Sequence, residues 1–211
     1  MRPSIATKGE PARLAGEVLD AAARVFARQG YEGTSIDDIA DELGATKGRV
    51  YHYYRSKADI LLDVLNKGQQ DLVDIIRPLA EDTTLPADQR LLNMARAHAE
   101  VMMYQHPYQY VSLRSLNPNL FDGKTAQREG WRTIRKMREE YEELFRAVVE
   151  EGSEDGTFST TNPRLTVRGI LGSLNWITVW FHPDHQPQAK HVSKEEIAQT
   201  LAKFVVAGAR G

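Results

Sequence analysis

The 211-residue sequence contains no cysteine, which excludes disulfide bonds, thiol nucleophiles and thiolate metal sites. It also lacks a long apolar run, since the longest mostly apolar stretch, residues 170–181, is far shorter than the ~20 residues that cross a bilayer. Neither sign of charge dominates, because 27 Lys and Arg stand against 29 Asp and Glu and leave a net charge of −2. With no signal peptide expected before Gly9, we expect a cytoplasmic protein without a membrane partner.

The signatures of common enzyme classes are absent as well. The sequence has no Gly-x-Ser-x-Gly, no P-loop and no His-Glu-x-x-His, and its Ser and His residues show no spacing that suggests a relay. We therefore expect no catalytic residues, no enzyme activity and no cofactor. One group of residues could imitate a metal site, but its proline-containing loop has no helical spacing to fix the ligands, so no metal is predicted there. That group is His182, Asp184, His185 and His191.

Helical periodicity runs through most of the chain, and nothing reads as a strand. We predict an all-α fold of about nine helices, in which a three-helix helix-turn-helix head, residues 1–58, precedes a larger ligand-binding and dimerisation body, residues 59–211. Proline, glycine and capping residues set the expected helix ends. The expected helices are 11–30, 34–43, 47–54, one from 56 that Pro78 and the polar stretch 81–84 stop, 86–107, a short helix within 108–124, one closing near 152–156, 165–182 and one from 193.

Residues 34–57 read as a helix-turn-helix that leads into a further helix. Thr34 is predicted to cap the first helix, with Asp37 three residues on as the capping-box acid, and Gly44 is predicted to close it. Thr46 follows as the expected cap of the second helix. Because this break is so short, the second helix must cross the first at a steep angle and project outward.

The second helix of the pair is predicted to turn most of its side chains outward, since only Val50 and Tyr54 share an inward face. Cations next to hydroxyls supply phosphate contacts and base-edge donors together, which is what a DNA-reading helix needs. Ser56 is expected to cap the next helix and to place Lys57 at its N-terminus. A lysine is unfavourable there unless an anion also binds.

The stretch GYEGTSIDDIADELGATKGRVYHYYRSKADIL resembles the N-terminal DNA-binding signature of the TetR family of bacterial transcriptional regulators. The resemblance implies that Tyr51, Tyr53 and Lys57 grip phosphates and that residues 47–49 face base edges of a double-stranded operator. The position of His52 varies in that family, so its role stays open. The predicted DNA-binding residues are Thr34, Ser35, Thr46, Lys47, Gly48, Arg49, Tyr51, His52, Tyr53 and Lys57.

Two helices near the C-terminus suit an interface. Small residues on the predicted helix 165–182 let another backbone approach closely, and the helix after residue 193 is apolar along one stripe. We expect a C2 homodimer that buries both helices of each chain in a four-helix bundle, an arrangement that the resemblance also implies. The alternative is that they are core helices of a monomer. The predicted interface residues are Gly169, Gly172, Ile197, Leu201, Phe204 and Val205.

Aromatic and methionine side chains crowd the body around residues 107–124, next to a run of cations in 124–138. Interrupted helices leave the irregular walls that pockets need, and flanking cations suit a long amphipathic anion. An ordinary core and a solvated charged face are the alternatives. The predicted ligand-binding residues are Met102, Tyr108, Phe121, Arg128, Trp131, Arg132, Arg135, Trp176 and Trp180.

Residues 174–181, LNWITVWF, resemble the eighth helix of those TetR-family members that respond to acyl-coenzyme A thioesters in fatty-acid or steroid catabolism. This resemblance implies a coenzyme A thioester as the effector. The sequence thus predicts a ligand-responsive DNA-binding regulator, expected to be a repressor that a small molecule releases from a near-palindromic operator. Control by a protein partner or by a different hydrophobic ligand remains open.

Overall fold

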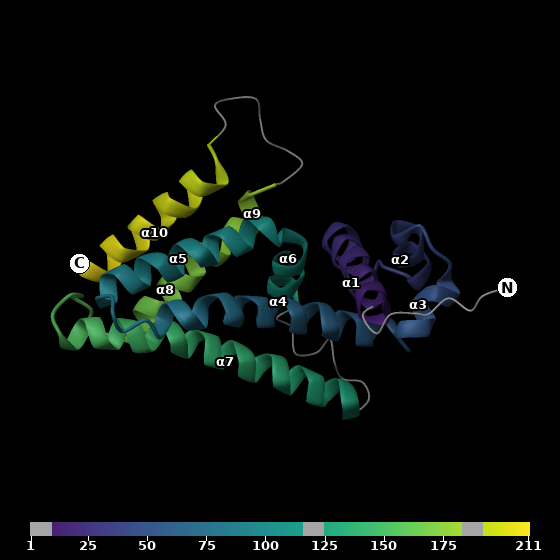
Figure 1. The fold of residues 1–211 in the computed structure, drawn as a ribbon, viewed down its shortest axis with the longest axis horizontal. Coiled ribbons are helices and arrows are strands. Elements are labelled where there is room, and N and C mark those ends of the chain that lie inside the picture. The colour runs from purple at the N-terminus through teal and green to yellow at the C-terminus, as the bar shows by residue number, and fades with distance from the viewer. Residues whose placement is uncertain (1–9, 116–124, 183–191) are drawn as a thin grey trace.

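The computed structural model describes residues 10–115, 125–182 and 192–211, and in these ranges every regular element is a helix (Figure 1). The predicted all-α fold is therefore confirmed. None of these helices is long and apolar enough to span a membrane. The helices are α1 (Glu10–Gln29), α2 (Ile36–Leu43), α3 (Lys47–Tyr53), α4 (Lys57–Ala80), α5 (Ala87–Tyr104), α6 (His106–Arg114), α7 (Thr125–Glu154), α8 (Pro163–Asn175), α9 (Ile177–Trp180) and α10 (Lys194–Arg210).

Helices α1, α2 and α3 form the head, and its core continues into the body. Val18 and Phe26 of α1, Ile39 of α2 and Val50 of α3 pack in one apolar cluster with the first turns of α4. The same cluster includes residues of α6 and α7, so the apolar core continues past the predicted domain boundary at residue 58. Gly44 closes α2 in the left-handed conformation, with φ of 65°, as predicted.

The capping residue of α2 is Ser35, one position later than predicted. Ser35 Oγ accepts from the backbone N–H of Asp38 at 3.1 Å, and Asp38 Oδ2 accepts from the backbone N–H of Ser35 at 2.7 Å. Thr34 is instead buried, and its hydroxyl donates to the carbonyl of Gly30 at 2.7 Å. The hydroxyl of Thr34, which was predicted to cap α2, is therefore bound to the turn after α1, and Asp37 does not take part in the capping box.

The body is a layered bundle around α5. Helix α4 runs from the head into the body with α7 alongside it, while α10 lies along α5 (Figure 1). Helix α4 ends at Ala80, directly before the polar stretch 81–84 that was expected to stop it, and Pro78 lies inside its last turn. One expected helix end is wrong, because Pro107 stands in the first turn of α6 instead of ending α5. A proline in a first turn has no intrahelical N–H bond to lose.

The predicted helix 165–182 is broken into α8 and the single turn α9. At the break, Thr178 Oγ1 donates to the carbonyl of Asn175 at 2.9 Å. Asn175 is also held from the side, because its Oδ1 accepts from His98 Nε2 at 3.1 Å. A hydroxyl that competes for a helix carbonyl interrupts the regular ladder of backbone hydrogen bonds. The described ranges consequently hold ten helical segments, against the nine expected.

Candidate functional site

Helix α3 is anchored by two side chains and presents the rest to solvent. Val50 and Tyr54 are buried in the head core, as predicted. Tyr51 is 49% exposed, and Tyr53 is half-buried with its ring edge-on to that of His52, at 4.9 Å between centroids. The exposed members of the predicted DNA-binding set are Ser35, Thr46, Lys47, Gly48, Arg49, Tyr51 and His52.

The N-terminal end of α3 is tied to α2 by charge. Lys47 Nζ donates to Asp37 Oδ2 at 2.7 Å, and this hydrogen bond raises the pKa of Lys47. Thr46 occupies the N-cap position but makes no capping hydrogen bond with its side chain. Its hydroxyl is therefore available to an outside acceptor. The other predicted cap, Ser56, does bind its helix, accepting from the N–H of Asp59 at 3.2 Å.

Lys57 joins the start of α4 to the turn between α1 and α2. Its Nζ donates to the carbonyls of Tyr31 and Thr34, both at 2.7 Å, and lies 4.4 Å from the centroid of the Tyr31 ring. An ammonium carries three N–H donors, so one remains beyond these two bonds. The residue that the sequence assigned to phosphate contact is thus also a brace that fixes the head against α4.

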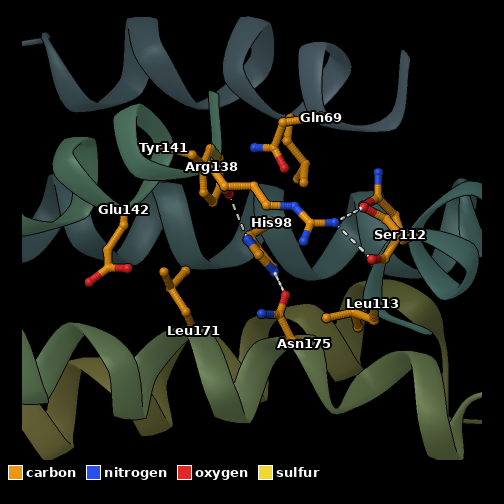
Figure 2. Close-up of a pocket in the computed structure, with 11 residues that line it drawn as sticks. Gln69, His98, Ser112, Leu113, Arg138, Tyr141, Glu142, Leu171 and Asn175 are labelled. Atoms are coloured by element: carbon orange, nitrogen blue, oxygen red, sulfur yellow. Dashed lines mark hydrogen bonds between the residues drawn. The ribbon is translucent and has the colours of Figure 1, made fainter. Parts of the chain in front are cut away.

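A cavity of about 190 Å³ lies in the body among α4, α5, α6, α7 and α8. Figure 2 shows polar side chains from all five helices around one space, namely Gln69, His98, Ser112, Arg138 and Asn175, while Glu142 points away from them. None of the predicted ligand-binding residues within the described ranges lines it. Its lining residues are Gln69, Leu72, His98, Gln109, Ser112, Leu113, Arg138, Tyr141, Glu142, Leu171 and Asn175.

His98 stands at the centre of the cavity wall and is only 1% exposed. Its Nδ1 lies 2.6 Å from the hydroxyl of Tyr141, and its Nε2 lies 3.1 Å from Oδ1 of Asn175. Because the amide oxygen only accepts, Nε2 carries the proton and Nδ1 accepts from the tyrosine. Burial lowers the pKa of His98 to about 4, so the imidazole is neutral at physiological pH.

Arg138 reaches the cavity from α7 without a carboxylate partner in the described ranges. Its Nη2 donates to the carbonyl and the hydroxyl of Ser112 at 2.7 and 2.9 Å (Figure 2). Burial lowers the pKa of Arg138. Glu142, one turn along α7, instead faces Arg168 at 3.6 Å. Across the cavity, the buried amide nitrogen Nε2 of Gln69 has no hydrogen-bond partner.

The residues predicted to bind a ligand are scattered over the body. Met102 is buried in the main core, and the Tyr108 hydroxyl donates to Asp20 of α1 at 2.6 Å. Trp131 is half-buried, with its ring 5.8 Å from the Arg138 guanidinium. Phe121 lies outside the described residues. The remaining five side chains are exposed: Arg128, Arg132, Arg135, Trp176 and Trp180.

Exposed apolar side chains gather on the C-terminal helices. Leu165 of α8 is 61% exposed, Trp176 after α8 is 61% exposed and Phe204 of α10 is 64% exposed. Gly169 and Gly172 have open space where a side chain would stand. Among the other predicted interface residues, two are half-buried and one is buried in this chain's own core: Ile197, Leu201 and Val205.

No group of three potential metal ligands occurs in the described part of the chain. His182 is exposed beside Phe181 at the end of one described range. Asp184, His185 and His191 lie outside the described residues.

Two family models match the sequence. Residues 18–64 match bacterial regulatory proteins of the tetR family, and residues 84–209 match the tetracyclin repressor-like C-terminal domain. The chain is also 26% identical over 202 residues to KstR2 of Mycobacterium tuberculosis, named an HTH-type transcriptional repressor, with 92% of this chain and 94% of that protein covered.

Solved structures share the fold. The ketosteroid transcriptional regulator KstR2 of Mycobacterium tuberculosis superposes with a TM-score of 0.80 at 22% identity, covering 93% of this chain and 95% of its own. PfmR of Thermus thermophilus gives 0.75 at 28% identity, covering 90% and 97%. AibR, in complex with isovaleryl coenzyme A and operator DNA, gives 0.72 at 20% identity, covering 93% and 98%.

Proposed function

The chain belongs to the tetR family of bacterial regulatory proteins, and we propose that it is a homodimeric repressor that a small-molecule effector releases from a near-palindromic operator. The observation that carries the proposal is the combination of an outward-facing α3 with a cavity in the body that is lined by both polar and apolar side chains. The name of KstR2 supports repression. Its family is one of transcriptional regulators, which act by binding DNA.

Helix α3 supplies both kinds of DNA contact. The buried Val50 and Tyr54 fix its rotation, so Arg49 and Tyr51 point away from the head. An arginine can donate two hydrogen bonds to a guanine edge, whereas a tyrosine hydroxyl suits a phosphate oxygen. Lys47 is held by Asp37 in the free protein, and DNA binding would exchange that exposed ion pair for contacts to DNA. Solvent screens such an exposed pair, so breaking it costs little stability.

The exposed face of α8 and α10 suits a second copy of the chain. A large phenyl ring at Phe204 and the open backbone at Gly169 and Gly172 are complementary shapes, and a two-fold axis would bring each to the other. Trp176 and Trp180, which the sequence suggested for ligand binding, would then contribute apolar area to the dimer or its edge. Two heads on one body would read half-sites about one helical turn or more apart.

A coenzyme A thioester is the effector class that we propose, with a different hydrophobic ligand or a protein partner as the alternatives. AibR has been seen with isovaleryl coenzyme A and operator DNA, which supports a thioester in this fold. The exposed cations of α7, Arg128, Arg132 and Arg135, offer charge to the phosphates of the carrier. The acyl group would enter the body cavity, because a polar carrier of that size exceeds about 190 Å³.

Helix α6 connects the cavity to the head. Gln109 lines the cavity and donates to the carbonyl of Gly68 in α4 at 3.0 Å. The adjacent residue, Tyr108, donates to Asp20 in α1. A ligand that displaces α6 would therefore act on both α1 and α4, and the spacing of the two heads would change. The effect can be no larger than the preference of the ligand for the released state.

The proposal is tested by measuring, with fluorescence anisotropy, how tightly the protein binds DNA from the promoter region of its own gene. The complex is then titrated with thioesters, with the matching free acids and with coenzyme A alone. We expect tight binding of a near-palindromic site and weaker binding when a thioester is present. By reciprocity, the DNA must weaken thioester binding by the same factor. Native mass spectrometry on the same samples reports the stoichiometry and the bound mass. Tight binding of an isolated half-site by a monomer would contradict the dimer, and indifference to every thioester would contradict the effector class.

A further inference from the structure

Three side chains on the wall of the body cavity carry hydrogen-bond donors that have no acceptor in the described part of the chain. Arg138 uses Nη2 for Ser112, and its remaining N–H groups have no hydrogen-bond partner in the described part of the chain. The Nε2 amide of Gln69, a residue only 4% exposed, is buried without an acceptor. The Asn175 amide directs its oxygen to His98, so its NH₂ group is left as a further donor. A fully buried donor without an acceptor, as at Gln69, costs about 1–3 kcal/mol, so an acceptor on a ligand would stabilise it.

The charge of the cavity is equally one-sided. Arg138 is the guanidinium at the centre of Figure 2, facing Gln69, His98 and Ser112. An arginine stays protonated in proteins, and His98 is a neutral neighbour. Glu142 is the carboxylate on the lining, and it is drawn toward Arg168. The cavity therefore holds one uncompensated positive charge together with neutral donors.

We infer that Arg138 and Gln69 together receive a carboxylate at the buried end of the effector. The guanidinium fork matches the two oxygens of a carboxylate, and the amide of Gln69 donates a further bond from α4. This inference rests on the proposed control by a small molecule and specifies which group that molecule buries. The carboxylate belongs either to a free organic acid or to the far end of a dicarboxylic acyl thioester.

The size of the cavity limits the rest of the ligand. Liquid water takes about 30 Å³ per molecule, and binding cavities for larger ligands span roughly 300–1,000 Å³. A space of about 190 Å³ accepts a carboxylate with a short carbon chain. Leu72, Leu113 and Leu171 supply the apolar surface for that chain. A coenzyme A carrier would remain outside.

Two matched ligand pairs test the inference by isothermal titration calorimetry on the full-length dimer without DNA. The free-acid pair is pentanoate and pentanamide, and the thioester pair is glutaryl-coenzyme A and 5-methylhexanoyl-coenzyme A, in which a neutral isopropyl group replaces the carboxylate. We expect the charged member to bind at least about tenfold more tightly, since a charge-assisted hydrogen bond in a buried site is worth that much or more. The pair that shows this preference identifies the source of the carboxylate.

Arg138→Met should abolish the preference, and Gln69→Leu should reduce it a few-fold, because a neutral donor contributes less. Arg135→Met is the matched control, since this arginine lies on the same helix but is exposed. It should keep the preference of the native chain. Arg138→Lys keeps the charge but loses the fork, and it should show an intermediate preference. Thermal unfolding of each variant identifies any that fails to fold, in which case Arg138→Lys and Gln69→Leu decide.

Three results would overturn the inference: equal binding of the charged and neutral members in both pairs, an Arg138→Met variant that matches Arg135→Met, or no binding of any of the four ligands. Operator binding is measured on the same preparations. If the operator still binds while no carboxylate does, the carboxylate site is wrong and the DNA-binding role stands. If operator binding is absent as well, the proposed function itself fails.

Discussion

Lowering the pH should destabilise the body through His98. The imidazole is buried between Tyr141 and Asn175, and burial lowers its pKa to about 4 in the folded chain. In the unfolded chain the same ring has the ordinary value of 6.5. At a pH between these two pKa values, His98 is protonated in the unfolded state and neutral in the folded state. The stability contributed by the neutral ring is therefore complete above pH 6.5 and is lost as the pH falls toward 4.

The size of this loss follows from the two pKa values. Each unit of difference corresponds to about 1.4 kcal/mol, so the full gap is worth about 3 kcal/mol once the pH is below both values. At pH 5 the loss of stability is about 2 kcal/mol, because this pH is still above the pKa of His98 in the folded state. For a domain of ordinary stability, about 5–15 kcal/mol, this is a large share.

Urea unfolding at pH 7.5 and pH 5.0 measures the effect, at one protein concentration because dimerisation also contributes to stability. The native chain should lose about 2 kcal/mol more than His98→Gln, in which the replacement cannot take up the proton. His182→Gln, which alters an exposed histidine, should behave like the native chain. NMR titration should show a histidine ring that stays neutral at pH 5, and the signal of that ring should be missing from the spectrum of His98→Gln. Equal pH dependence in the native chain and His98→Gln would refute the reasoning.

Three further outcomes are expected. Tyr51→Phe should weaken binding to every DNA sequence alike, whereas Arg49→Ala should also reduce discrimination between operator and mutated operator by about 1–3 kcal/mol, as anisotropy on both duplexes would reveal. Phe204→Glu should give a folded monomer by light scattering, and a persistent dimer would place the interface elsewhere. Tyr108→Phe removes the bond to Asp20 and should cost about 1–3 kcal/mol in urea unfolding while narrowing the ratio of operator affinities with and without effector.

Local sequence patterns predicted most of the helices because each carries its own start and stop. Ser56 caps α4 as expected, and Ser193 caps α10 at the start predicted for that helix, since a serine followed by a helical stripe has little competition nearby. The inward pair of Val50 in α3 and Tyr54 at its C-terminal end was also predictable, because these two apolar side chains share an i, i+4 face. These features depend on neighbours within one turn, and so the sequence alone decides them.

The cap of α2 could not be assigned in the same way. Thr34 and Ser35 are adjacent hydroxyls, and Asp37 and Asp38 are adjacent acids, so the capping pattern fits in two registers. The choice is made by the carbonyl of Gly30, which accepts from Thr34 and removes it from competition. That contact joins the end of α1 to the turn, and no spacing within α2 encodes it.

The cavity was unpredictable for a related reason. Its lining comes from five helices, and the sequence does not say which helical faces meet. Composition drew the ligand hypothesis toward Trp176 and Trp180, which the structure leaves exposed. In the basic run of α7, Arg132 and Arg135 point to solvent while Arg138 reaches the cavity. Arg138 is directed into the cavity by its hydrogen bond to Ser112 of α6, which lies on a different helix.

The break between α5 and α6 explains how a small cavity could control a distant head. Because α6 has only nine residues, the side chains that face the cavity and those that face the head lie close together on one short helix. Arg138 holds its C-terminal end through Ser112, and Tyr108 holds α1 through Asp20. A hydrogen bond to a charged group contributes about 1.5–3 kcal/mol, and coupling between a ligand and an operator is typically about 1–3 kcal/mol. Loss of the single bond between Tyr108 and Asp20, caused by a ligand that draws Arg138 away from Ser112 and lets α6 shift, would therefore be large enough to lower operator affinity tenfold.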